Sequence, residues 1–277
     1  MTDQPIHLHL VSDSTGETVH QNARAALSQF PEREVTEHIW TLVRSVAHVD
    51  AIERGLERNP GIVLYSIIDP EIRAEIEAMC KRRAVPFLAI LDPLIQLFSG
   101  VLGEQTHHRP GAQHKLDSAY FKRMAAVEFA VNHDDGMNMD NLDGADILLI
   151  GVSRTSKTPT SMYLANRGYR VANYALVPHI EFPIHHIKDK DLFVVGLTTD
   201  PRRLIQVRRN RLEHMQDRQN ESYADLERVT DEIKAARQLF AKNGWPVLDI
   251  SRRSVEETAA SIIHLHTKWQ ESQTDDS

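Results

Sequence analysis

Short apolar runs alternate along the chain with longer segments in which apolar residues recur at helical spacing. Residues 61–68 (GIVLYSII) form a nearly continuous apolar run, which is typical of a strand buried on both faces. Residues 71–83 instead repeat apolar side chains every three or four positions, which predicts a helix. The alternation of these two patterns predicts a mainly parallel α/β layer. Strands are expected at 6–11, 35–43, 61–68 and 86–91, the last again buried, and helices at 22–30, 48–58 and 71–83.

The alternation of strand-like and helix-like segments is interrupted at 100–115, which contains several glycine, proline and histidine residues, and it resumes after residue 144. Between them we predict a long helix near 116–131 and a polar connection at 137–144, where we place a domain boundary. The predicted domains are therefore 1–140 and 141–277. The apolar stripe of the long helix is expected to comprise Leu116, Tyr120, Met124, Val127 and Val131. Further strands are expected at 145–150, 169–177, 192–197 and 246–250, and helices at 160–167, 201–218, 222–242 and 254–269.

Composition narrows the class of protein. The 277 residues are 41% hydrophobic and 26% charged, which is an ordinary globular balance and argues against wholesale disorder. We expect no membrane helix, because no apolar run approaches the roughly 20 residues that one needs, and the first residues show no signal-peptide pattern. The single cysteine, Cys80, excludes an internal disulfide and favours a cytoplasmic location. A formal charge of −7 argues against a protein that coats nucleic acid.

The most informative stretch is 147–159 (ILLIGVSRTSKTP), in which a buried strand enters Gly151 and a helix is predicted after Lys157 and Thr158. This is close to the phosphate-binding loop G-x-x-x-x-G-K-[ST]. In such a loop, backbone N–H groups surround phosphate oxygens, the lysine reaches the terminal phosphates and the hydroxyl can ligate Mg²⁺. The expected binding residues are Gly151, Val152, Ser153, Arg154, Thr155, Ser156, Lys157 and Thr158.

One position departs from this pattern. Ser156 stands where the motif has its second glycine, which normally allows a positive φ, so we expect the loop to form only if that dihedral is ordinary here. The alternative is a polar turn with a solvent-facing lysine. The phosphate-loop hypothesis makes the second domain P-loop kinase-like.

Other polar groups admit two interpretations each. Residues 12–18 (SDSTGET) form either a second anion cradle or an N-cap. Asp134 and Asp135 either accept a proton from an attacking hydroxyl or merely end a helix in water. Asp69, Asp92 and Asp200 each precede proline and are expected to be helix caps. The histidines lack metal-ligand spacing, so we predict no metal site built from protein ligands alone. A cluster of arginines forms a solvated helix face, a phosphate-facing lid or a nucleic-acid surface: Arg202, Arg203, Arg208, Arg209 and Arg211.

Several segments together resemble a known family, the bifunctional serine/threonine kinases and phosphorylases that regulate pyruvate, phosphate dikinase, with a sister group that regulates phosphoenolpyruvate synthase. Serine at position 156 is usual in this family, and Ser14 favours the dikinase group, because the sister group has glycine there. The matching segments are 12–18, 120–130 (YFKRMAAVEFA), 133–136 (HDDG), 151–159, 171–174 (VANY), 196–198 (GLT) and 254–258 (SVEET).

The resemblance implies an ADP-dependent kinase that phosphorylates a threonine of the dikinase and so inactivates it. It also implies the reverse reaction, in which inorganic phosphate removes the phosphoryl group and pyrophosphate is released. The loop 151–158 would bind ADP, with Mg²⁺ expected beside it. Lys157 would neutralise charge on the transferred phosphoryl group, assisted by Thr158 and Arg154, and Asp134 or Asp135 would orient the acceptor hydroxyl.

Competing hypotheses stay open at this stage. The same chemistry on phosphoenolpyruvate synthase is one, an ATP-dependent small-metabolite kinase is a second, and a nucleotide-sensing or RNA-binding module is a third. We expect a cytoplasmic homodimer that has the dikinase as its protein substrate and binds neither nucleic acid nor membrane.

Overall fold

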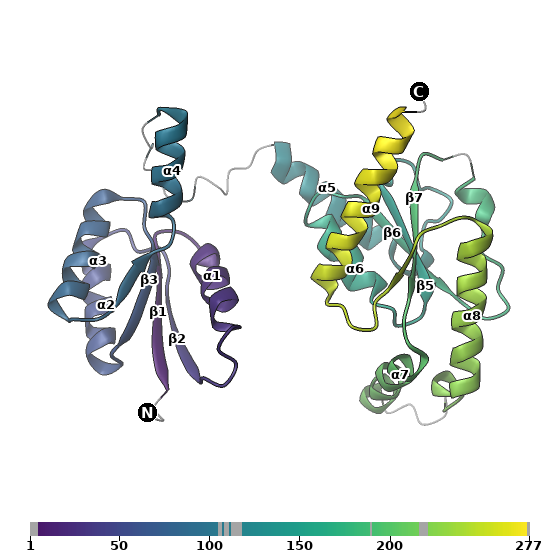
Figure 1. Cartoon of the computed structure of the whole chain (residues 1–277), viewed down its shortest axis with the longest axis horizontal. Coiled ribbons are helices and arrows are strands. Elements are labelled where there is room, and N and C mark those ends of the chain that lie inside the picture. The colour runs from purple at the N-terminus through teal and green to yellow at the C-terminus, as the bar shows by residue number, and fades with distance from the viewer. Residues whose placement is uncertain are drawn as a thin grey trace. The chain divides into compact units, whose positions relative to one another are not determined.

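The computed structural model describes residues 5–104, 107, 111, 118–188, 190–215 and 221–275. The chain divides into two compact units, Met1–Lys115 and Leu116–Ser277, and each contains a four-stranded parallel sheet (Figure 1). Two α/β units confirm the predicted fold class. Within the described residues, no helix is both long and apolar enough to cross a membrane.

The first unit has the sheet order β2-β1-β3-β4. Its strand β1 packs Leu8 and Leu10 against α1 on one face, whereas Val11 joins the cluster beneath α2 and α3 on the other. The elements are β1 (Ile6–Ser12), α1 (Glu17–Leu27), β2 (Val35–Trp40), α2 (Val46–Arg58), β3 (Gly61–Ser66), α3 (Pro70–Arg82), β4 (Phe87–Ala89) and α4 (Asp92–Leu102).

Three features of this unit differ from the sequence predictions. Strand β4 is an edge strand with Leu88 58% exposed, so the apolar run at 86–91 does not mark a fully buried strand. Helix α4 was not predicted, and it buries none of its side chains although it is rich in leucine. Helix α1 also begins at Glu17, directly after the loop that follows β1, rather than at residue 22.

The second unit repeats the same strand order, as β6-β5-β7-β8. Apolar positions of β5 alternate between two cores: Leu148 and Ile150 face α7 and α8, whereas Ile147 and Leu149 face α6 and α9. Figure 1 shows α6 and α9 on one side of this sheet and α8 on the other. The elements are α5 (Ser118–Asn132), η2 (Asp134–Gly136), β5 (Ile147–Val152), α6 (Lys157–Ala165), β6 (Val171–Leu176), η3 (Ile184–His186), β7 (Phe193–Thr198), α7 (Pro201–Met215), η4 (Glu221–Ala224), α8 (Leu226–Lys242), β8 (Val247–Asp249) and α9 (Val255–Asp275).

Helix α5 corrects two expectations. It packs against α6 and β6, so the chain divides before this helix rather than within 137–144. Its buried face is formed by Ala126 and Ala130, which pack on Ala165, while Met124 and Val131 are 41% and 53% exposed. Of the predicted stripe, Val127 packs against this cluster, so the prediction holds only in part. Leu116, its first member, lies outside the described residues.

The strand order determines where a ligand can bind in the second unit. Strand β5 is central, and the chain leaves it first toward β6 on one side and later toward β7 on the other. Connections diverge at such a point and leave a crevice at the carboxyl ends of the strands, where α/β folds bind ligands. The loop 153–156, between β5 and α6, lies at this end.

Candidate active site

Strand β5 enters the loop at Gly151, where only glycine fits. A Cβ atom there would stand 2.6 Å from Thr155 Oγ1 and 2.7 Å from the backbone oxygen of Leu197. The Thr155 hydroxyl donates a 2.9 Å hydrogen bond to the Val152 oxygen, and its side chain is fully buried. These contacts curl the backbone back on itself immediately before α6.

Two residues of the loop have left-handed backbone conformations. Arg154 has φ 73°, and Ser156, the N-cap of α6, has φ 52° and ψ 25°. Ser156 therefore adopts the positive φ for which the phosphate-loop pattern uses glycine, contrary to the expectation that a serine requires an ordinary dihedral here. Left-handed conformations cost L-residues about 1–2 kcal/mol each, and such strain concentrates at functional sites.

Lys157 is the first residue of α6 and points inward. Its side chain is only 5% exposed, and Nζ donates a 3.1 Å hydrogen bond to the Val152 oxygen. Burial lowers the pKa of Lys157 to about 8, although the nearby carboxylates of Asp135 and Asp134 oppose this shift. The alternative of a solvent-facing lysine is therefore wrong, and the buried ammonium is placed to neutralise an anion bound by the loop.

The carboxylate of Asp134 bridges the loop helix and the neighbouring strand. Its Oδ1 accepts hydrogen bonds from Thr158 Oγ1 at 2.8 Å and from Asn173 Nδ2 at 2.6 Å. Asn173 is fully buried on β6, and its Oδ1 accepts a 3.1 Å hydrogen bond from the backbone N–H of Asp135. Asn173 thus holds both aspartates beside α6, a role that the sequence motif VANY did not reveal.

Asp135 stands in a different environment from Asp134. It is exposed, it has φ 52°, and its carboxylate accepts no hydrogen bond from the described residues. The next residue, Gly136, has φ 91°, and a Cβ atom there would lie 3.1 Å from the ring of Tyr174. This constrained turn keeps one carboxylate bonded to Thr158 and leaves the other accessible.

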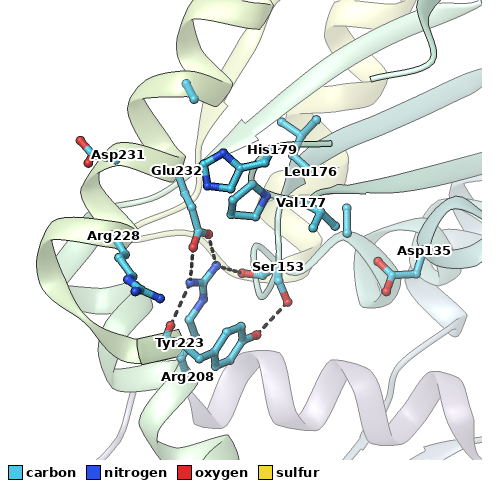
Figure 2. Close-up of a pocket in the computed structure, with 13 residues that line it drawn as sticks. Asp135, Ser153, Leu176, Val177, His179, Arg208, Tyr223, Arg228, Asp231 and Glu232 are labelled. Atoms are coloured by element: carbon cyan, nitrogen blue, oxygen red, sulfur yellow. Dashed lines mark hydrogen bonds and ion pairs between the residues drawn. The ribbon is translucent and has the colours of Figure 1, made fainter. Parts of the chain in front are cut away.

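Two cavities adjoin the loop and share Asp135 and Ser153 in their linings. The smaller, of about 290 Å³, lies over the loop and the start of α6, where Arg154, Ser156, Lys157 and Thr158 line it. The larger, of about 790 Å³, lies between the end of β6 and the elements α7, η4 and α8 (Figure 2). The exposed side chain of Arg154 lines the smaller cavity, and its part in phosphate binding stays a prediction.

Arg208 differs from the other arginines of its cluster because it is buried. It is 1% exposed and forms an ion pair with Glu232, with Nη2 2.6 Å from Oε2 (Figure 2). The guanidinium also donates to the backbone oxygens of Tyr223 at 3.0 Å and Ser153 at 3.3 Å, and the Tyr223 hydroxyl lies 2.8 Å from Ser153 Oγ. Arg208 therefore ties the loop to α8 and η4, whereas the remaining arginines are exposed: Arg202, Arg203, Arg209 and Arg211.

The site fits a magnesium ion that is shared with phosphate oxygens. Within the described residues, no three His, Cys, Asp or Glu side chains gather around a possible metal position. Mg²⁺, however, commonly takes one or two protein oxygens, completing its shell with phosphate and water. The Thr158 hydroxyl and the Asp134 carboxylate, already 2.8 Å apart, offer oxygens of that kind beside the loop.

The loop 12–18 of the first unit follows the corresponding central strand. Gly16, with φ 81°, is the left-handed N-cap of α1, as Ser156 is the left-handed N-cap of α6. The next residue is Glu17 in the first unit and Lys157 in the second. The buried Asp13 carboxylate accepts a 2.6 Å hydrogen bond from the Ile68 N–H, and burial raises the pKa of Asp13. A cavity of about 250 Å³ adjoins this loop, which shares a left-handed N-cap with the second-unit loop but lacks its lysine.

The other aspartates have structural roles. Asp69 and Asp200 accept hydrogen bonds from backbone N–H groups in the first turns of α3 and α7, as expected for caps. Asp92 differs, because it lies within α4 and forms an ion pair with Arg73 at 3.0 Å.

Fold and site together define an α/β protein with a strained, lysine-bearing loop facing two carboxylates. The chain matches the Kinase/pyrophosphorylase family over residues 8–263, and it belongs to that family. A relative from Erythrobacter litoralis is 50% identical over 263 residues, which is 95% of each chain. One from Novosphingobium aromaticivorans is 49% identical over 265 residues, covering 96% of this chain and 95% of its own. Both are named as pyruvate, phosphate dikinase regulatory proteins.

Proposed function

We propose that this chain is a bifunctional phosphotransferase that uses ADP to phosphorylate a threonine of pyruvate, phosphate dikinase. The same site would remove that phosphoryl group with inorganic phosphate. The observation that carries the proposal is the convergence of Lys157 and Thr158, at the start of α6, with Asp134 and Asp135. The names of the relatives support the dikinase as the protein substrate.

In the kinase direction, the loop 151–158 would hold the two phosphates of ADP. The acceptor hydroxyl oxygen bonds to the β-phosphorus, and the bond from that phosphorus to the bridging oxygen of AMP breaks. Lys157 neutralises the charge that develops on the transferred group, and Arg154 assists from the tip of the loop. The hydroxyl proton passes to Asp135, because that carboxylate is exposed, whereas Asp134 is engaged with Thr158 and Asn173.

In the reverse direction, an oxygen of inorganic phosphate attacks the phosphorus of the phosphothreonine. The bond to the threonine oxygen breaks and pyrophosphate forms. The attacking phosphate gives up a proton to Asp135, which passes it to the threonine oxygen. Inorganic phosphate would occupy the position of the ADP β-phosphate, so one loop serves both reactions. Mg²⁺, beside Thr158 and Asp134, would screen charge between the phosphates.

The test is incubation with purified dikinase, phosphoenolpyruvate and ADP labelled in its β-phosphate. We expect label on a dikinase threonine, and its release as pyrophosphate when inorganic phosphate is added. Label transferred only from ATP, or only to a small molecule, would refute the proposal in favour of a metabolite kinase. Phosphoenolpyruvate synthase, assayed in parallel, distinguishes the two protein substrates.

A further inference from the structure

The larger cavity adjoins the proposed reaction centre and shares only two lining residues with the cavity over the loop. It measures about 790 Å³ and meets the smaller cavity over the loop at Asp135 and Ser153. Figure 2 shows Asp135 at one side of it, with Arg228 and Asp231 on α8 at the other. Cavities of roughly 300–1,000 Å³ suit ligands of drug size, so this one can accept a short chain segment but not a folded domain.

Direct phosphoryl transfer constrains what can occupy this cavity. The attacking and leaving oxygens lie roughly in line on opposite sides of the transferred phosphorus. If Asp135 receives the acceptor proton, the acceptor approaches from the side of Asp135, and the nucleoside lies on the opposite side. The cavity that begins at Asp135 is therefore on the acceptor's side of the loop.

The wall formed by β6 is suited to an extended peptide. Strand β6 is the edge of its sheet, and the outward backbone N–H of Asn173 donates to the His133 oxygen at 3.0 Å. The backbone N–H of Ala175, two residues further along, points to the same side of the strand as that of Asn173. It has no hydrogen-bond partner among the described residues. Ala175 and the following residues line the cavity, so an uncovered strand edge faces it.

The side chains around this edge fit a peptide better than a charged nucleotide. Leu176, Val177 and Pro178 form an apolar wall, and Ala235 of α8 contributes a small side chain. The charge of buried Arg208 is compensated by Glu232, whereas Arg228 and Asp231 are exposed and opposite in sign. The lining therefore offers apolar contacts and charges of both signs rather than a concentrated positive charge.

We propose that this cavity binds the threonine-bearing segment of the protein substrate as an extended peptide along the outer edge of β6. Backbone hydrogen bonds to the edge would fix its register, as in other cases of strand addition, and the apolar wall would select the neighbouring side chains. The inference rests on the proposed function, because it assumes that Asp135 is the proton acceptor for a protein hydroxyl.

The test compares two tryptophan substitutions on exposed alanines of α8. Ala235→Trp fills the cavity, whereas Ala241→Trp lies on the same helix outside the cavity lining and is the matched control. For each variant, the KM for purified dikinase is measured in the ADP-dependent reaction, and the Kd for ADP is measured by calorimetry without dikinase. We expect Ala235→Trp to raise the KM for dikinase about tenfold or more while the Kd for ADP stays within about twofold; Ala241→Trp should change neither.

A second variant addresses the strand edge. Ala175→Pro removes one outward N–H, which edge strands tolerate, and it should also raise the KM for dikinase while the melting temperature stays near that of the wild type. Weaker ADP binding in Ala235→Trp with an unchanged KM for dikinase would place the nucleoside in the cavity and overturn the inference, as would an unchanged KM alone. A wild-type protein that transfers no phosphoryl group to the dikinase would instead refute the proposed function itself, and this inference with it.

Discussion

The hydroxyl of Thr158 donates a 2.8 Å hydrogen bond to Oδ1 of Asp134, 24 residues earlier in the chain. This contact joins the helix that follows the loop to the turn that follows α5. It also gives the two neighbouring aspartates different environments, because Asp134 is engaged by Thr158 and Asn173 whereas Asp135 lines both cavities. The distinction can be tested by conservative substitution.

Asp135→Asn should reduce the kcat of the kinase direction by about 100- to 10,000-fold, because the amide cannot accept the threonine proton. The Kd for ADP should change far less than kcat, because Asp135 acts on the loop only through its charge and makes no hydrogen bond to it among the described residues. Asp134→Asn should instead raise the Mg²⁺ concentration needed for half-maximal rate. Magnesium titrations of both variants check the assignment, and interchanged behaviour would reverse the roles of the two aspartates.

Lys157→Ala should abolish both the kinase and the phosphorolysis reaction, with a loss of roughly 100- to 1,000-fold or more in each kcat. The reason is that both reactions place the transferred phosphoryl group beside the same buried ammonium. Initial rates in both directions are the measurement, with the exposed Lys242→Ala as control. If only one direction were lost, the idea of a single phosphate site would fail.

Affinity for ADP should fall as the pH rises above 8. The pKa of Lys157 is lowered to about 8 in the free protein, and a bound phosphate favours the protonated amine and so raises that pKa. Binding then takes up a proton, and the Kd rises by up to about tenfold per pH unit between the free and bound pKa values. Calorimetry in buffers of different ionisation enthalpy at pH 8.5 should detect this uptake.

The matched control for the pH effect is Lys157→Arg, whose guanidinium stays protonated over this range. Its affinity for ADP should be independent of pH from 7 to 9, whatever its absolute value. Should the wild type also show a flat profile and no proton uptake, Lys157 would not be the group that titrates on binding.

The strand pattern of this chain could be predicted because strands buried on both faces leave apolar runs in the sequence. The 147–152 run and the loop that follows it are local features, so they were located from the sequence. The contact of Lys157 with the Val152 oxygen and its burial were not, because inward or outward direction depends on the dihedrals of Arg154 and Ser156. A left-handed serine has no local sequence signal of its own.

Contacts between residues far apart in the sequence explain two other differences between the sequence predictions and the structure. Five arginines of one helix segment look alike in sequence, and only the ion pair with Glu232, 24 residues later, distinguishes Arg208. Helix α5 packs through Ala126 and Ala130, which carry little hydrophobic weight in a periodicity argument. Helix α4 was not predicted, and its apolar side chains are exposed rather than packed against a core.

The stability of the first unit should decrease below about pH 6.5, the ordinary pKa of histidine. His9 is fully buried, its Nδ1 accepts a hydrogen bond from Trp40 Nε1 at 3.2 Å, and burial lowers its pKa, with His38 and His7 adding to the shift. A lowered folded-state pKa means that the unfolded chain takes up the proton first. The stability is therefore present above the unfolded-state pKa and is lost as the pH falls toward the folded-state value.

Hydrogen exchange of β1 and β2 between pH 7.5 and 5.5, corrected for intrinsic rates, measures this loss. His9→Leu should show a smaller dependence on pH, although its stability at pH 7.5 will be lower because the hydrogen bonds to Trp40 and to the Asn59 oxygen are removed. Equal pH dependence in the two proteins would assign the effect to other histidines.

The homodimer expected from the sequence is best tested at α4. This helix exposes Leu97, Phe98 and Val101 by 60%, 59% and 75%, and a row of exposed apolar side chains on one helix is characteristic of an association surface. Leu97→Glu with Val101→Glu places charges on that surface and should convert a dimer to a monomer in light scattering, without lowering the melting temperature of the monomer, because neither side chain is packed in a core. The matched control Arg58→Glu, on the exposed end of α2, should stay dimeric. A wild type that is monomeric at micromolar concentration, or a double variant that remains dimeric, would show that α4 does not join two chains.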